Sequence, residues 1–167
     1  MLMHPIETPE RSFRRALGSF ATGVTIVSGL LSGQAMGATV NSFSSVSLNP
    51  KLVLFGMRKQ SVCLRCFDVG QPFAISVLNA GQAALANHFA SPKSDKWADV
   101  PHHSGETRCP IVVGAIASFE GRVQAQYEAG DHVVVFGLVH RFEMDAKEEP
   151  LVFLRGGYGS VQLDARN

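Results

Sequence analysis

Residues 37–50, GATVNSFSSVSLNP, are the stretch on which the interpretation of this chain depends. Six of the fourteen positions carry a short polar side chain that can donate and accept hydrogen bonds: Thr39, Asn41, Ser42, Ser44, Ser45 and Ser47. The apolar positions between them are expected to pack inward: Val40, Phe43, Val46 and Leu48. The pattern predicts a binding surface for a polar, planar ligand. A solvated loop rich in turn-forming residues is the alternative interpretation.

Strand patterns flank this stretch on both sides. Residues 24–30 are a β-branched run, and Ser32-Gly33 is a turn signal that leads into a second strand ending at Val40. The stretch is therefore the exit of a predicted β-hairpin. After the Asn49-Pro50 turn, residues 52–57 are apolar enough for a strand buried on both faces.

The other segments predict further strands with short helices between them. Thr8 and Pro9 fit the cap and first turn of an amphipathic helix whose apolar face carries Phe13, Leu17 and Phe20. The later segments are assigned as follows: strands at residues 72–78, 115–127, 133–142 and 151–155, a helix at 81–90, a long polar loop at 91–108 and a turn at 129–132. Because strands and helices do not alternate regularly, the order favours an antiparallel β-barrel over a doubly wound parallel sheet.

A polar corner precedes the next predicted helix, which runs from Ser61 to about residue 69. Ser61 fits the N-cap, and Arg58 and Lys59 stand beside the helix N-terminus, where a phosphate could be held. A solvated basic turn is the alternative. Cys63 and Cys66 fall within this helix, so we interpret them as core-facing residues and not as a redox pair.

Composition limits the class of protein. With 167 residues the chain is expected to form a single domain over 1–167, with its core at about 11–160. Apolar residues make up 46% of the chain and charged residues only 17%, which predicts that a partner or a second copy covers part of the surface. A formal charge of +1 without a run of Lys or Arg argues against nucleic acid and anionic membranes as partners.

Several familiar signatures are missing from the sequence. No run of about 18 apolar residues occurs, and the first nine residues do not follow the pattern of a signal peptide. Three cysteines therefore predict reduced thiols and a cytoplasmic protein. His102 and His103 have no Cys or carboxylate at a metal-ligand spacing, so no metal site is expected. The common nucleotide-loop, hydrolase and zinc-protease motifs are also absent.

Several motifs in order carry a family resemblance. They are FRRALGSFATGVTIVS, GATVNSFSSVSLNP, the polar corner at Ser61, FAISVL with LANHFA, YEAGDHVVVFGLV and PLVFLRGGYG. Over about residues 11 to 160 the chain resembles the short-chain flavin reductases, the NAD(P)H-dependent reductase components of two-component flavin monooxygenases. The resemblance implies a mainly β fold, a split antiparallel β-barrel of Greek-key type with short helices. It also implies a homodimer and a separate monooxygenase partner that receives reduced flavin.

The resemblance implies a set of site residues as well. It places Thr39, Asn41, Ser42 and Phe43 around the ring system of FMN or FAD, with Ser47 nearby. It also implies that Ser61, Arg58 and Lys59 contact the flavin phosphate. Further implied flavin contacts are His88 and Phe89 at a helix end and Arg155 and Tyr158 in the C-terminal segment. His132, in the Gly-Asp-His turn, is implied to lie close to the nicotinamide of NADH or NADPH.

The predicted chemistry agrees with the missing nucleophile motifs. Hydride transfer from a dihydronicotinamide to a flavin takes its reactivity from the cofactors, and the protein supplies geometry and polarity. A donor such as His132 can orient the nicotinamide. Two alternatives stay open: a flavin-binding electron carrier on the same barrel, which would not need His132, and a scaffold dimer without a cofactor. Without the other motifs, His132 would be interpreted as an exposed strand start.

Overall fold

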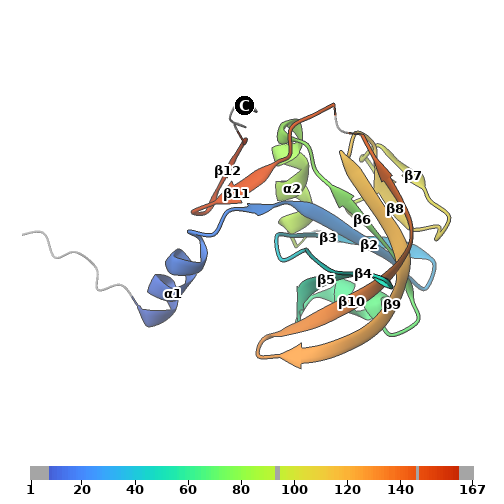
Figure 1. The fold of residues 1–167 in the computed structure, drawn as a ribbon, viewed down its shortest axis with the longest axis horizontal. Coiled ribbons are helices and arrows are strands. Elements are labelled where there is room, and N and C mark those ends of the chain that lie inside the picture. Colours follow the sequence, from blue (N-terminus) through green and yellow to red (C-terminus); the bar gives the residue numbers. More distant parts are fainter. Residues whose placement is uncertain (1–7, 93–94, 146, 162–167) are drawn as a thin grey trace, which may run out of the picture.

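A computed structural model describes residues 8–92, 95–145 and 147–161. Its main feature is a seven-stranded antiparallel sheet with the strand order β3-β2-β6-β9-β10-β5-β4 (Figure 1). The strands are β2 (Thr25–Leu31), β3 (Gln34–Val40), β4 (Ser44–Leu48), β5 (Lys51–Arg58), β6 (Pro72–Val77), β9 (Ala117–Ala129) and β10 (His132–Met144). Together with few short helices, they make the protein mainly β, as expected from the sequence.

Two smaller sheets and four short helices complete the described structure. One sheet joins β1 (Thr22–Gly23), β11 (Val152–Leu154) and β12 (Gly157–Gly159), and the other pairs β7 (His102–Ser104) with β8 (Pro110–Val112). The helices are α1 (Pro9–Leu17), α2 (Ala83–Ala90) and the 3₁₀ helices η1 (Val62–Phe67) and η2 (Ala80–Gln82). No helix within the described residues is long and apolar enough to cross a membrane.

The predicted hairpin before the polar stretch is confirmed. β2 and β3 pair antiparallel from Thr25↔Val40 to Leu31↔Gln34. Ser32 and Gly33 form the two-residue turn with φ angles of 51° and 82°, the positive values that match the twist of paired strands. The strand after Asn49-Pro50 is also present, but it alternates: Val53, Phe55 and Met57 are buried while their neighbours are partly exposed, so the prediction of burial on both faces was wrong.

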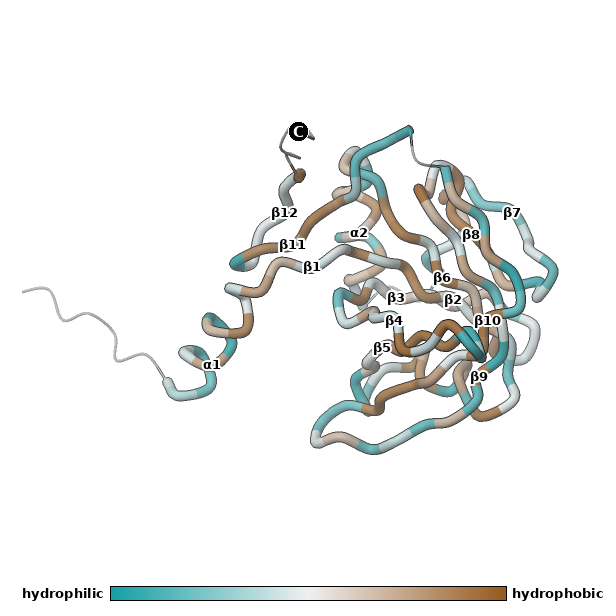
Figure 2. The backbone as a smooth tube through the Cα atoms, in the orientation of Figure 1, coloured by the Kyte–Doolittle hydropathy of each residue, from teal (hydrophilic) through white to brown (hydrophobic). Residues whose placement is uncertain are grey.

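The sheet curls around one aromatic core, and its apolar segments gather at its centre (Figure 2). Phe55, Phe67 and Phe73 are fully buried, and the ring of Phe55 lies 5.1 Å from Phe67 and 6.3 Å from Phe73, centroid to centroid. Val40 of β3 packs in the same cluster as Val53 of β5. Strands from opposite halves of the order therefore share a core, although among the described strands β3 and β4 remain the two open edges.

A second core lies under α2. Leu78, Ala86, Phe89, Trp97 and Leu151 are buried there. Trp97 is 4% exposed and packs on Phe89 at 4.6 Å, which corrects the expectation that residues 91–108 form a polar loop. Trp97 and Val100 of this segment therefore belong to the second core together with residues of α2.

Three other predictions are corrected. The helix predicted from Ser61 is a six-residue 3₁₀ helix that ends at Phe67, and the Ser61 side chain makes no capping hydrogen bond. Val46 and Leu48 do not pack inward: they lie on edge strand β4 and are 44% and 90% exposed. The amphipathic helix is present as α1 with Thr8 as its N-cap, but it ends at Leu17, so Phe20 is not part of its apolar face; α1 projects away from the sheets (Figure 1).

Candidate functional site

Three segments that are distant in the sequence meet at one corner of the large sheet. The first is the connection between β3 and β4, where Ser42 Oγ accepts a hydrogen bond from the Gly56 nitrogen at 2.9 Å and lies 3.3 Å from its carbonyl oxygen. The second is the end of β5 at Arg58, and the third is the start of β10, because His132 pairs with Arg58. Strand register therefore brings together predicted site residues from all three segments.

Gly56 is the centre of this corner. A Cβ atom at this position would lie 3.3 Å from Ser42 Oγ and 3.9 Å from His132 Cδ2. The two side chains thus flank the same backbone position, where no side chain separates them. Such a bare strand backbone between polar groups lets a flat ligand approach closely.

His132 is oriented by its neighbour in the chain. Its Nδ1 lies 2.8 Å from Asp131 Oδ1, and 41% of its side chain is exposed. The hydrogen bond and charge of His132 lower the pKa of Asp131. With Nδ1 engaged by the carboxylate, no hydrogen bond of Nε2 is found within the described residues. The backbone of Asp131 also accepts from the Lys59 nitrogen at 3.0 Å, which ties the turn to the polar corner.

The polar corner carries two cations and a hydroxyl. Arg58 and Lys59 are exposed and Ser61 is partly exposed. Lys59 Nζ pairs with Glu128 Oε2 at 2.8 Å, and this pairing lowers the pKa of Glu128. An exposed ion pair of this kind is weak and can open for an anionic ligand. The short 3₁₀ helix contributes little dipole, so any anion here would depend on the side chains.

The other residues of the polar stretch have mixed surroundings. Asn41 is exposed, and Ser47 follows a bulge in the pairing of β4 with β5 and is partly exposed. Phe43 packs on Phe119 with ring centroids 5.5 Å apart. Thr39 Oγ1 donates to the Ala86 carbonyl at 2.6 Å, so its hydroxyl holds α2 against β3. Because this hydroxyl already donates to α2, the predicted contact of Thr39 with a ligand depends on the atoms of Thr39 that make no other hydrogen bond.

The helix-end residues His88 and Phe89 are mostly engaged inside the protein. Phe89 is 1% exposed, and its ring lies under the backbone of Gly37. The Phe89 ring is a core group, and its predicted flavin contact stays a prediction. His88 Nε2 lies 2.8 Å from the Lys96 carbonyl oxygen.

Arg155 and Tyr158 lie in a different part of the structure from the other predicted site residues. They belong to the turn between β11 and β12 and to β12 itself, in the three-stranded sheet, and not to the corner around Ser42 and His132 (Figure 1). Tyr158 packs edge-on against Phe153 at 5.6 Å, and burial raises its pKa. Within one chain, the structure does not bring these two predicted residues together with the others.

Sequence reasoning missed one partly buried cation. Lys96 is partly buried, and its Nζ donates to the carbonyls of Phe89 at 2.7 Å and Gly37 at 3.4 Å. Burial lowers its pKa. The Cys63 thiol donates to the same Gly37 carbonyl at 3.3 Å. A lysine next to a tryptophan in a polar segment gives no sequence signal for this role, because the contact depends on tertiary packing.

Residues 17–162 match the flavin reductase like domain. The chain belongs to the flavin reductase family. Among its relatives, the FMN reductase (NADH) SmoA of Agrobacterium fabrum is 40% identical over 149 residues, which cover 89% of this chain and 84% of that protein. A probable flavin reductase of Rhizobium meliloti is 41% identical over 92% of this chain, which spans about half (49%) of that longer protein.

Comparison with solved structures supports this family assignment. The NADH:FAD oxidoreductase of Streptomyces globisporus, in complex with NAD and FAD fragments, superposes with a TM-score of 0.88 at 36% identity, covering 99% of both chains. The flavin reductase component of a bacterial two-component tryptophan halogenase superposes with a TM-score of 0.84 at 33% identity, covering 93% of this chain and 99% of that one. The resemblance inferred from the motifs is therefore confirmed. Among the described residues, no group of His, Cys, Asp and Glu could hold a metal ion.

Proposed function

We propose that the protein reduces FMN or FAD with NADH or NADPH and passes the reduced flavin to a separate flavin-dependent monooxygenase. The observation that carries this proposal is the meeting of Ser42 and His132 at the bare backbone of Gly56, with Arg58 as the register partner of His132, in a chain of the flavin reductase family. Relatives named as reductase components of monooxygenases support the oxygenase partner.

The residues at the corner fit a flavin nucleotide chemically. The polar edge of a ring system can exchange hydrogen bonds with Asn41 and Ser42, while Phe43 closes the apolar side. Arg58, Lys59 and Ser61 supply charge and a hydroxyl for a phosphate. When bound, the flavin supplies the hydride-accepting chemistry. The protein's own contribution is to bind and orient both partners, with His132 Nε2 on the nicotinamide side.

The remaining predicted contacts have a lesser place in this proposal. Ser47 and His88 border the site through their exposed faces, and Thr39 contributes through its backbone. Arg155 and Tyr158 act on a more distant part of a cofactor. These assignments follow the family resemblance and the exposure of each side chain.

The proposal includes a split β-barrel formed as a single domain. The shared core supports it, since Val40 of β3 and Val53 of β5 belong to one core cluster. It also includes a homodimer: Phe13, Leu17 and Phe20 are 65%, 59% and 77% exposed, an apolar surface that a second copy would cover. Light scattering coupled to gel filtration tests this, and a monomeric mass would contradict it.

The proposed location is the cytoplasm. All three cysteines are buried and unpaired by disulfides, as a reducing compartment allows, and NAD(P)H is supplied there. The formal charge of +1 gives no reason to propose nucleic acid or a membrane as a partner.

The decisive experiment is NADH and NADPH oxidation at 340 nm by the purified protein, with FMN or FAD added. Turnover that depends on free flavin is expected, and the four combinations identify the preferred pair. Bound flavin without turnover would instead indicate an electron carrier, and absence of flavin binding would leave only a scaffold on the same fold.

A further inference from the structure

The backbone carbonyl of Gly37, where residues 37–50 begin, accepts hydrogen bonds from two side chains. Gly37 is buried in β3; the Cys63 thiol of η1 donates to its carbonyl at 3.3 Å and Lys96 Nζ at 3.4 Å. Lys96 Nζ also donates at 2.7 Å to the carbonyl of Phe89, in the last turn of α2. One ammonium group therefore joins β3 to α2, and one carbonyl joins β3 to η1.

The backbone of Lys96 is held as well. His88 Nε2 lies 2.8 Å from the Lys96 carbonyl oxygen, and because a carbonyl only accepts, Nε2 is the donor. His88 thus binds the backbone of Lys96, while the side chain of Lys96 returns to the carbonyl of the next residue, Phe89. These contacts fix Lys96 although residues 95–97 belong to no helix or strand.

Two buried rings also pack against Gly37. A Cβ atom added there would lie 2.8 Å from the Phe89 ring and 3.0 Å from the Trp97 ring, and these side chains are 1% and 4% exposed. A glycine permits this close approach of rings to the strand backbone. Gly37 is therefore enclosed by α2, η1 and residues 95–97, and it can move only if buried groups move with it.

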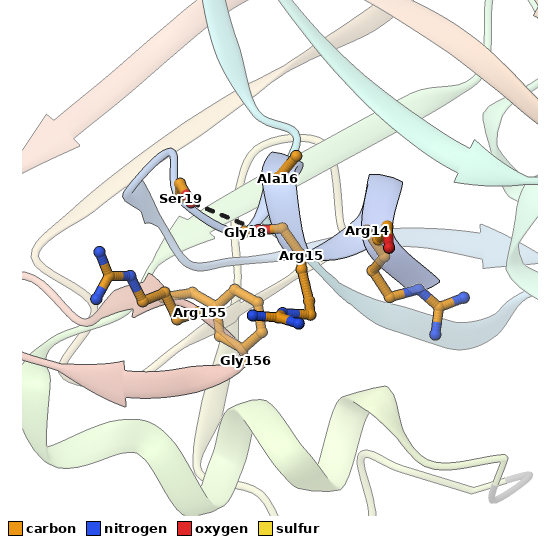
Figure 3. A pocket seen from close by; sticks show the side chains of 9 residues that line it. Arg14, Arg15, Ala16, Gly18, Ser19, Arg155 and Gly156 are labelled. Carbon is orange, nitrogen blue, oxygen red and sulfur yellow. Dashed lines mark hydrogen bonds between the residues drawn. The ribbon is translucent and has the colours of Figure 1, made fainter. Parts of the chain in front are cut away.

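Lys96 differs from the cations of the cavity between α1 and the β11–β12 turn. That cavity, of about 770 Å³, is lined by Arg14, Arg15 and Arg155, all of which are exposed (Figure 3). Lys96 is partly buried, and burial lowers its pKa. A partly buried ammonium group has lost hydration and needs hydrogen bonds within the protein in exchange. Its two carbonyl contacts supply them.

A cap at the end of α2 explains only part of this arrangement. The last carbonyls of a helix lack partners within the helix and favour cations, so the Phe89 contact alone would be ordinary capping. Capping does not account for the second contact of Lys96, with Gly37 on another element, or for the Cys63 thiol that shares it.

We propose that Lys96 is a positioning residue for flavin binding: by holding the carbonyls of Gly37 and Phe89, it sets the start of residues 37–50 relative to α2 and η1. The inference rests on the proposed function, in which these same segments contact the flavin. Three of the predicted flavin contacts lie within two residues of a group in this network: Thr39, Ser61 and His88. If the network is loosened, binding must first order these segments, and this ordering costs affinity.

The direct test is fluorescence titration of the purified protein with FMN. Lys96→Met removes the ammonium group and keeps a long side chain, and we expect the dissociation constant to rise about tenfold, as for the loss of hydrogen bonds from a charged group. Lys51→Met is the matched control, because it makes the same change at an exposed lysine at the start of β5. An equal rise in both variants would overturn the inference.

Steady-state kinetics separate positioning from a loss of folded protein. In Lys96→Met the KM for flavin should rise, with kcat at saturating flavin close to that of the unaltered protein. A merely structural defect would reduce the amount of active enzyme, which lowers the apparent kcat and leaves KM unchanged. That second result would overturn the inference.

Cys63→Ala tests the same carbonyl from η1, and it does so even if Lys96→Met fails to fold. It should raise the flavin dissociation constant by about threefold, since a thiol is a weaker donor than an ammonium group. The double variant should exceed the product of the two single effects, because the Gly37 carbonyl then loses both donors. An unchanged dissociation constant in Cys63→Ala, or purely multiplicative effects, would count against the shared contact.

Hydrogen exchange examines the network without flavin. Amides of residues 37–43 should lose protection in Lys96→Met, whereas those of β9 and β10 should keep it. Flavin binding by the unaltered protein, with an unchanged dissociation constant in Lys96→Met, would reject only the role of Lys96. No flavin binding by the unaltered protein would reject the proposed function, and faster exchange in Lys96→Met would then confine Lys96 to a role in the fold.

Discussion

Ser42 and Gly56 exchange hydrogen bonds between side chain and backbone, with Ser42 Oγ 2.9 Å from the Gly56 nitrogen. This contact fixes the β3–β4 connection against β5 at the point where His132 also arrives. A single hydroxyl thus positions both the polar stretch and the bare strand backbone beside it.

Ser42→Ala is expected to weaken flavin binding more than it lowers the stability of the fold. The lost hydrogen bond is partly exposed, so the free energy of unfolding should fall by only about 1 kcal/mol. The KM for flavin should rise several-fold because the connection is released. Ser44→Ala is the control, since within the described residues the Ser44 hydroxyl donates only to the carbonyl of its neighbour Ser45. Equal KM values in the two variants would contradict the role given to Ser42.

His132→Ala should impair the use of NAD(P)H without impairing flavin binding. We expect a higher KM for NAD(P)H or slower flavin reduction in stopped flow, with the flavin dissociation constant nearly unchanged. Asp131→Asn should produce a smaller effect in the same direction, because it loosens the 2.8 Å contact that orients the ring. A parallel loss of flavin binding in His132→Ala would reject the assignment to the nicotinamide side.

The local parts of this architecture could be predicted from the sequence. The Ser32-Gly33 turn and the Gly130 turn carry residues suited to positive φ, and alternating or β-branched runs mark the strands beside them. The connection after Val40 was recognised by its short polar side chains. Each of these features depends on neighbours in the sequence.

What could not be predicted depends on contacts between distant segments. The register that pairs His132 with Arg58 is set by the whole β5–β10 ladder. The burial of Trp97 and the cavity between Arg14 and Arg155 arise only when separate elements meet. The η1 helix ends at Phe67, where Asp68 already has extended backbone angles (φ −58°, ψ 151°), and Gly70 N then donates to the Val123 carbonyl of β9.

Gly37→Ala is expected to destabilise the protein by about 1–3 kcal/mol through overpacking. An added Cβ would lie 2.8 Å from Phe89 and 3.0 Å from Trp97, both of them buried rings. Gly23→Ala is the control: it lies in a strand, and a Cβ there meets no atom within 4 Å. Urea denaturation measures both, and similar midpoints for the two variants would contradict the packing described here.

Glu120 should act as a buried anchor for the β7–β8 hairpin. It is 4% exposed, and its Oε2 accepts from the Thr107 nitrogen at 2.9 Å and the Thr107 hydroxyl at 2.8 Å. Glu120→Ala would leave two donors unsatisfied, so the free energy of unfolding should fall by about 2–3 kcal/mol. Thr107→Ala should cost less, and a double-mutant cycle should show coupling between them. Additive effects would indicate that the carboxylate acts through other neighbours.

Because two of the thiols are buried, we expect the protein to lose stability at alkaline pH. Burial raises the pKa of Cys66 to about 12 and that of Cys109 to about 11, from 9.0 for a free thiol. Because the folded protein keeps these protons longer than the unfolded chain does, the stabilising contribution is complete below pH 9 and is lost as the pH rises through the folded pKa values. Urea midpoints should therefore fall between pH 9 and 11, and Cys66→Ala should flatten that fall.

In the same protein at pH 8, Cys66 and Cys109 should react with DTNB only after guanidinium is added; rapid labelling of the native protein would show that these thiols are not buried as described.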